Sequence, residues 1–244
     1  MELLQTLYNL RPLIIFLIEI TLCYLILKSN SKIKIPAFFL VLFLALYQLG
    51  EVLIIFTQST FANLFAFTAT SLIPVTALLL LEKVKFNSIK YTPILYSIPF
   101  GYIIYAIITP EVFVPLSIDY CFIKYGNLIA TSTIFFTWSI FYYIPFLFLG
   151  LFLSIIGTLY EQSPLKRRLF FLMSISYILT VPSSFVLSTL LNHSPLYIVS
   201  TMCSLAIFTA IFTYIIVKTD EKESHNKTLN IKNKKMKTKI KNKD

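Results

Sequence analysis

The sequence predicts an all-α membrane protein, a bundle of seven transmembrane helices with its N-terminus outside and its C-terminus in the cytoplasm. The chain of 244 residues is 57% hydrophobic and only 13% charged, whereas a soluble domain carries about 25% charge. The charges form short clusters between apolar runs that are long enough to cross a hydrocarbon core of about 30 Å. These runs lack the two-residue alternation of an outer-membrane barrel, so helices are expected.

Seven segments supply the roughly 20 residues that one membrane-spanning helix requires. They are Leu7–Leu27, Pro36–Phe56, Phe61–Leu81, Thr92–Thr109, Ser132–Leu153, Leu169–Leu190 and Leu196–Val217. Helices three to six each contain a proline, which predicts local bends. Because the chain has only five glycines and no GxxxG motif, close helix contacts are expected to come from serine, threonine and alanine.

The orientation follows from the lysine and arginine residues of the short loops. Three basic residues follow each of helices one, three and five, and ten more lie after Val217, so 19 of the 21 basic residues fall on one side. Only Arg11 and Lys124 fall on the other. The side rich in basic residues is therefore predicted to be cytoplasmic, which places the N-terminus outside.

Residues 1–218 form the predicted bundle, and residues 219–244 form a lysine-rich cytoplasmic tail. The tail has hardly any apolar residue, so it is predicted to be disordered. Its lysines are expected to meet anionic lipid headgroups. Nucleic acid is not an expected partner, since the other basic residues lie beside helix ends.

Two carboxyl side chains fall inside predicted membrane spans. Glu19 lies near the middle of helix one, and Glu51 lies in the outer half of helix two beside Gln48. A charged side chain there costs at least about 2.5 kcal/mol, so it normally faces the bundle interior and marks a function. The alternative is a protonated carboxyl group hydrogen-bonded to serine, threonine or tyrosine. No salt-bridge partner is expected within the membrane.

The external segment Pro110–Thr131 is long enough to cover the outer mouth of the bundle, and it contains Asp119. The alternative is an amphipathic segment lying at the interface. Trp138, the only tryptophan, is interpreted as an interfacial anchor, with a pocket wall as the alternative. The candidate ligand-binding residues are Glu51, Gln48, Glu19, Trp138 and Asp119.

Helix six carries a polar stripe at four-residue spacing, namely Ser176, Thr180, Ser184 and Ser188. Hydrogen bonding between helices is the favoured interpretation, and a ligand-lining wall is the alternative. No metal-ligand cluster, catalytic triad or glycine-rich phosphate loop occurs, so no catalytic residue and no cofactor is predicted. Cys23 and Cys203, which fall inside apolar runs, are interpreted as packing residues.

The run Tyr47-Gln48-Leu49-Gly50-Glu51 closes helix two, and Leu72-Ile73-Pro74-Val75 lies in helix three. Together with Lys166-Arg167-Arg168 and Phe212-Thr213-Tyr214, these residues resemble the N-terminal seven-helix sensor region of prokaryotic histidine kinases. The resemblance covers residues 1 to about 220 and consists of hydropathy and a few polar positions. No kinase module follows, so the resemblance implies a free-standing sensor that signals through a separate cytoplasmic protein.

Three classes of function are compatible with these features. A sensor or receptor-like domain for an external or membrane-borne ligand is the first prediction. A small-molecule transporter or permease is the second, although no matching broken helices mark two inverted halves. An intramembrane enzyme is the third, because two isolated carboxyl groups form no complete catalytic set.

Overall fold

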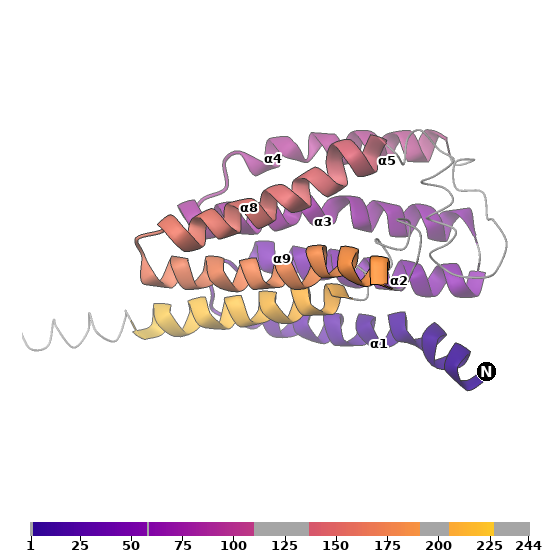
Figure 1. Cartoon of the computed structure of the whole chain (residues 1–244), viewed down its shortest axis with the longest axis horizontal. Helices are drawn as coiled ribbons and strands as arrows, with labels where there is room; N and C mark the ends of the chain where they lie inside the picture. Colours follow the sequence, from indigo (N-terminus) through magenta and orange to yellow (C-terminus); the bar gives the residue numbers. More distant parts are fainter. Residues whose placement is uncertain (1, 58, 110–136, 191–204, 227–244) are drawn as a thin grey trace, which may run out of the picture.

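The computed structural model describes residues 2–57, 59–109, 137–190 and 205–226, and these form a helical bundle without strands in the described ranges (Figure 1). The labelled helices are α1 (Glu2–Leu27), α2 (Lys34–Thr57), α3 (Thr60–Phe86), α4 (Thr92–Leu95), α5 (Ser97–Ile108), the π-helix η2 (Ser139–Tyr143), α8 (Ile144–Tyr160) and α9 (Pro164–Leu190). A further helix spans residues 205–226.

Local sequence signals explain where α3 begins and ends. The Ser59 hydroxyl caps the N-terminus by accepting a hydrogen bond of 3.2 Å from the Ala62 N–H. At the other end Asn87 adopts a left-handed conformation with φ of 54°, and its N–H donates to the Lys83 carbonyl over 2.9 Å. Lys83 and Lys85 lie in the last turn, where cations favour the helix dipole. The helix therefore extends five residues beyond the predicted end at Leu81.

The predicted fourth helix is interrupted after Leu95, where α4 ends before α5 begins at Ser97. Pro99 has no N–H to donate to the Leu95 carbonyl, so regular helical bonding fails there. The predicted fifth helix extends beyond its predicted end, since α8 ends at Tyr160 rather than at Leu153.

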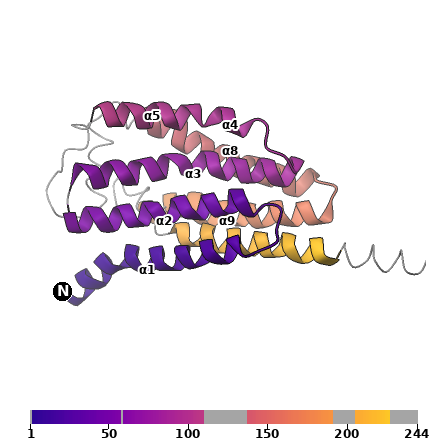
Figure 2. The same ribbon diagram turned by 180° about the vertical axis from the view of Figure 1, so that it is seen from behind.

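The helices run roughly side by side along the length of the molecule (Figures 1 and 2). α2 packs extensively against both α1 and α3, and α8 packs against α9. Gly50 allows the close approach of α2 and α3, since a Cβ atom added there would lie 2.6 Å from the Ala66 Cβ. Gly150 and Gly157 on α8 likewise face side chains of α9. The expectation that glycine contributes nothing to close contacts was therefore wrong.

Four described helices are long and apolar enough to cross a membrane, with spans Leu10–Leu27, Lys34–Thr57, Thr60–Phe86 and Ser139–Tyr160. Large apolar side chains lie exposed on the outside, among them Phe141 at 70% and Ile108 at 72%. An apolar exterior of this kind is typical of a surface covered by lipid rather than water. The fold is that of a helical protein compatible with embedding in a membrane through several spans.

The loops rich in basic residues meet at one end of the bundle, on the left in Figure 1. The helix 205–226 is joined there to the loop that follows α1. The Ser31 hydroxyl donates to Asp220 over 2.7 Å, and the backbone N–H of Asn30 donates to Glu221 over 2.8 Å. Residues 219–226 are helical, so the prediction of disorder was wrong for these residues. Residues 227–244 lie outside the described ranges.

Candidate ligand-binding site

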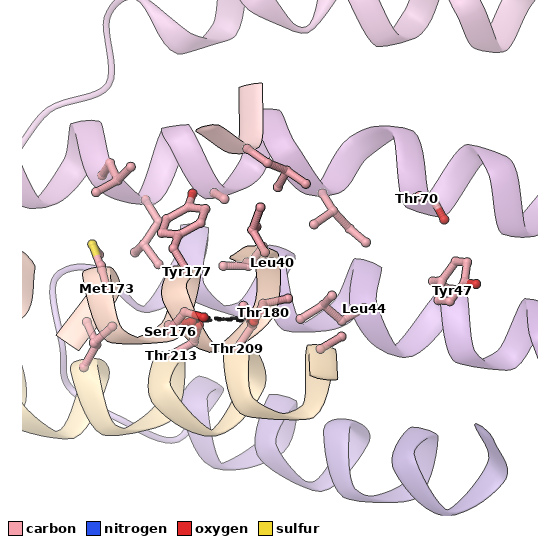
Figure 3. Close-up of a pocket in the computed structure, with 18 of the residues that line it drawn as sticks. Leu40, Leu44, Tyr47, Thr70, Met173, Ser176, Tyr177, Thr180, Thr209 and Thr213 are labelled. Atoms are coloured by element: carbon pink, nitrogen blue, oxygen red, sulfur yellow. Dashed lines mark hydrogen bonds between the residues drawn. The ribbon is translucent and has the colours of Figure 1, made fainter. Parts of the chain in front are cut away.

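A cavity of about 60 Å³ lies between α2, α3, η2, α8, α9 and the helix 205–226 (Figure 3). Most of its wall consists of aliphatic side chains. They include Leu40 and Leu44 of α2, Ile73, Ala77, Leu80 and Leu81 of α3, and Leu147, Met173, Val181, Ala206 and Ile216 from the later helices. Clefts between helices of a bundle are common sites for small ligands.

The cavity is elongated along the helix axes. Its α3 wall extends from Thr70 to Leu81, a length of about 16 Å at the rise of an α-helix. In Figure 3, Tyr47 and Thr70 lie at one end and Met173 and Tyr177 lie toward the other. The shape therefore favours a slender molecule aligned with the helices over a compact one.

A group of hydroxyls gives this apolar cavity one polar side. On the helix 205–226 the lining residues recur every three or four positions and thus share one face. Thr209 on that face lies 2.7 Å from the Thr180 hydroxyl and accepts a hydrogen bond of 3.4 Å from Ser176. Ser176 and Thr180 thus form hydrogen bonds between two helices, as the favoured interpretation expected, and they also line the cavity.

The remaining stripe residues, Ser184 and Ser188, have side chains outside the described part of the structure. Tyr177, one position after Ser176, packs against α8. A Cβ atom added to Gly150 would lie 2.3 Å from the Tyr177 hydroxyl. That hydroxyl is buried and has no hydrogen-bond partner among the described residues.

Tyr47 connects the cavity with the predicted carboxyl site. Its side chain forms part of the wall, and its hydroxyl donates a hydrogen bond of 2.5 Å to Glu51. Glu51 and Gln48 are buried, with exposed fractions of 3% and 1%. Neither lines the cavity, so a ligand there contacts Tyr47 and reaches Glu51 only through it.

The two carboxyl groups have different surroundings. Glu51 interacts electrostatically with Arg11 of α1. Glu19 is completely buried on α1, and neither of its carboxyl oxygens has a hydrogen-bond partner among the described residues. Glu19 and Glu51 interact with each other electrostatically.

Trp138 is buried rather than interfacial, with an exposed fraction of 1%. Its ring packs against Phe67 at 5.2 Å and stacks on Tyr143 at 4.7 Å between ring centroids. An interfacial anchor presents its ring at the protein surface, so the burial of Trp138 contradicts that interpretation. Trp138 supports Tyr143, which lines the cavity.

The π-helix η2 places Tyr142 and Tyr143 beside α3. The N–H of Ile144 bonds the Ser139 carbonyl five residues earlier, which is the π pattern. Pro145 follows at once and has no N–H of its own. The Tyr142 hydroxyl donates to the Ser71 carbonyl and thereby joins η2 to α3. Single π turns are frequent at functional sites.

Asp119 and the whole segment Pro110–Thr131 lie outside the described residues. The cavity residues Tyr47, Tyr177 and Thr209 were not among the candidate ligand-binding residues predicted from the sequence. Thr209 and Thr213 could have been found from their spacing, because they lie four residues apart in an apolar run. Two hydroxyls at this spacing lie on one face of a helix, where they can meet the polar stripe of helix six. Tyr47 entered the sequence prediction only through the run that carries the sensor resemblance, and not as a candidate ligand-binding residue.

No protein-family model, no curated protein and no solved structure matches this chain. The function is therefore inferred from the site itself. Its wall contains aliphatic groups and hydroxyls and, among the described residues, no acid, base or thiol. Such a wall is suited to binding a neutral, mainly apolar molecule that can exchange one or two hydrogen bonds with threonine or tyrosine.

Proposed function

We propose that this chain is a seven-span membrane sensor that binds a small, neutral, largely apolar ligand in the cavity between its helices. The ligand reaches the site from outside or from the bilayer, and a separate cytoplasmic protein reads the bound state. The proposal rests on the cavity, on the apolar exterior and on the resemblance to sensor regions that carry a kinase.

The proposed orientation places the end that holds the basic loops in the cytoplasm. Lys85 and Lys166 lie at that end, where Lys85 pairs with Glu161 at 3.0 Å and the Lys166 ammonium donates to the Lys85 carbonyl over 2.6 Å. Asp220 and Glu221 accept hydrogen bonds from Ser31 and Asn30 in the loop that follows α1. A cluster of loop lysines on one side agrees with the positive-inside rule.

The observation that carries the sensing proposal is the position of the helix 205–226. Thr209, Thr213 and Ile216 form part of the cavity wall, and Asp220, one turn later, accepts hydrogen bonds from Ser31 and Lys32. One helix thus contacts both the cavity and the loop that follows α1. A ligand can shift this helix only if it binds the protein more tightly in one position of the helix than in another. Such a shift changes the surface that a cytoplasmic partner contacts.

The experiment compares small molecules that remain bound to purified protein. Parent protein, Ala77→Phe and Gly101→Leu are purified from the same membranes, and their extracts are analysed by mass spectrometry. Ala77 lines the cavity, so phenylalanine fills it. Gly101 has open space around it, so leucine there is a matched control. We expect one compound to be retained by the parent and the control and to be lost from Ala77→Phe.

The signalling part is tested with the compound so identified. Spin labels at the exposed positions Lys90 and Lys222 report the separation of two cytoplasmic helix ends. A change of the label distance on addition of the compound supports sensing. An unchanged distance, or equal retention by Ala77→Phe, contradicts the proposal.

A second candidate function is small-molecule transport, favoured by the buried carboxyl group of Glu19, since intramembrane acids often mark ion or proton pathways. Proteoliposomes separate the two functions. A transporter accumulates the retained compound inside the vesicles against a gradient, whereas a sensor binds it without net uptake.

A further inference from the structure

The register of the α2–α3 hairpin arranges the cavity in layers. Gly50 of α2 faces Ala66 of α3, and both helices rise by the same amount per residue. Each step back along α2 is therefore level, within one residue, with an equal step forward along α3. The level pairs that line the cavity are Tyr47 with Thr70, Leu44 with Ile73, and Leu40 with Ala77. One end layer thus contains two hydroxyls, and the two layers that follow it are aliphatic.

The width of the cavity matches a single alkyl chain. Its volume of about 60 Å³ is the space open to the centre of a water molecule. Averaged over the length of about 16 Å, and with the water radius of about 1.4 Å added, this space is a channel about 2.5 Å in radius. Carbon atoms in contact lie about 4 Å apart, so an unbranched chain needs about 2 Å on each side of its axis. Fused rings and paired chains are wider than this channel.

The length of the cavity sets the length of the chain. Carbon–carbon bonds of about 1.52 Å at angles of about 111° advance an extended chain by about 1.25 Å per carbon, so the α3 wall accommodates about 10 to 14 carbons. Beyond the level pairs the wall continues with Leu80, Leu81 and Met173. Tyr47 and Thr70 lie at the opposite end from Met173 (Figure 3). A polar head group is therefore expected beside Tyr47 and Thr70, with the chain extending toward Met173.

The hydroxyl hydrogens at the head-group end already have acceptors within the protein. Tyr47 donates to Glu51 over 2.5 Å, and Thr70 donates to the Ala66 carbonyl over 2.9 Å. A hydroxyl oxygen also accepts hydrogen bonds, so Thr70 can receive a hydrogen from a ligand but has none to give. An alcohol satisfies this requirement. A ketone or ester carbonyl would find no donor in either hydroxyl, which is unfavourable for a buried polar group.

The hydroxyls farther along the wall are satisfied among themselves. Thr180 donates to the Ser176 carbonyl over 2.9 Å, so in its 2.7 Å contact with Thr209 the Thr209 hydroxyl is the donor. The Ser176 hydroxyl in turn donates to Thr209 over 3.4 Å. An alkyl chain can therefore pass these three side chains without depriving them of hydrogen bonds.

We propose that the ligand is an unbranched long-chain alcohol of about 10 to 14 carbons. Its hydroxyl donates to Thr70, and its chain extends along the level pairs toward Met173. This inference rests on the proposed function, because it names the ligand class of the same cavity.

The test measures the unfolding temperature of the full chain in detergent. The added compounds are 1-octanol, 1-dodecanol, 1-octadecanol, dodecane and 2-dodecanone, at equal mole fraction in the micelles. Each methylene group should tighten binding about fourfold until the chain fills the cavity. We therefore expect 1-dodecanol to raise the unfolding temperature most, by about 5 to 10 °C at about one hundred times its Kd. Dodecane and 2-dodecanone should act more weakly, since neither donates a hydrogen bond.

Thr70→Val removes the acceptor oxygen and keeps the shape of the side chain. It should remove the advantage of 1-dodecanol over dodecane, which is expected to be about five- to tenfold in Kd, whereas Thr70→Ser should retain this advantage. Thr68→Val is the matched control. Thr68 makes the same type of bond to the Leu64 carbonyl, over 2.8 Å, but it does not line the cavity.

The outcomes separate this inference from the proposed function. An equal or larger effect of 2-dodecanone or 1-octadecanol overturns the long-chain alcohol and leaves ligand binding in the cavity intact. An advantage of 1-dodecanol that persists in Thr70→Val overturns the hydrogen bond to Thr70. Equal effects of every compound on the parent and on Ala77→Phe contradict both proposals, because the cavity then binds none of them.

Discussion

The Tyr47 hydroxyl donates a 2.5 Å hydrogen bond to Glu51 while the same side chain forms part of the cavity wall. A single residue thus lines the cavity on one side and contacts a buried carboxyl group on the other. A ligand that displaces the Tyr47 ring disturbs that hydrogen bond. A change in the charge of Glu51 changes the same bond and so acts on a side chain of the cavity wall.

Tyr47→Phe removes the hydroxyl and keeps the ring. We expect a loss of about 1 to 2 kcal/mol in the free energy of unfolding, because Glu51 loses a buried hydrogen bond. Glu51→Gln keeps an oxygen acceptor for Tyr47 and should cost less. Unfolding in detergent measures both, with Tyr91→Phe, at an exposed position, as the control. A stable Tyr47→Phe protein would show that this bond contributes little.

Gly50→Ala should destabilise the contact between α2 and α3 by about 1 to 3 kcal/mol, since the new methyl group meets Ala66 at 2.6 Å and overpacking is costly. Gly101→Ala is the matched control, because a Cβ atom there has no neighbour within 4 Å. Alanine replaces glycine in a helix in both variants, so the helix-propensity gain of about 1 kcal/mol is shared. Equal unfolding temperatures for the two variants would contradict the close packing.

Glu82 holds the turn between α3 and α4. Its carboxylate accepts backbone hydrogen bonds from Lys90 at 2.6 Å, Tyr91 at 2.8 Å and Thr92 at 2.9 Å, and another from the Thr92 hydroxyl. Glu82→Ala leaves these donors without their acceptor, so we expect a loss of about 3 kcal/mol in the free energy of unfolding. Lys90→Ala, at an exposed position, is the control. Proteolysis within residues 87–92 should accelerate in Glu82→Ala alone.

The Glu221 contact at the basic end should depend on pH. The Lys218 ammonium and the Asn30 N–H hold the pKa of Glu221 below its ordinary value. Its stabilising contribution is therefore present above the unfolded-state pKa of about 4.3 and is lost as the pH falls through the lower folded-state pKa. The pair is partly exposed, with side-chain fractions of 46% for Lys218 and 24% for Glu221, so the contribution should stay under about 1 kcal/mol.

Comparison of the parent with Glu221→Gln measures this contribution. The difference in their unfolding temperatures should be largest near neutral pH and should vanish in acid. A difference that is independent of pH would mean that the charge of Glu221 does not matter.

The sequence predicted the bounds of a long helix well where a continuous run of apolar residues defines them. α2 spans Lys34–Thr57, close to the predicted Pro36–Phe56, because continuous apolar residues between polar ends define it. The burial of Glu19 and Glu51 was also expected, since a charged side chain in an apolar helix turns away from lipid.

Other features depend on which helix faces meet, and a single sequence does not show this. The hydroxyls of Thr180 and Thr209 come together only because α9 packs against the helix 205–226. Trp138 was placed at the interface from its position near a helix end, whereas the packing of Phe67 and Tyr143 buries it. Asp220 appeared to belong to a solvated tail because its partner Ser31 is 189 residues away.

The central claim is a bundle of seven membrane spans with the basic end in the cytoplasm, and reporter fusions test it most directly. Fusions after Lys34, Lys90, Arg168 and Lys222 should report the cytoplasm, and fusions near Ser59, Lys124 and His193 should report the outside. This alternation requires six crossings between Lys34 and Lys222, and a crossing by α1 adds the seventh and places the N-terminus outside. A cytoplasmic signal at Lys124, or an external signal at Lys222, would contradict the proposed orientation and the sensing mechanism built on it.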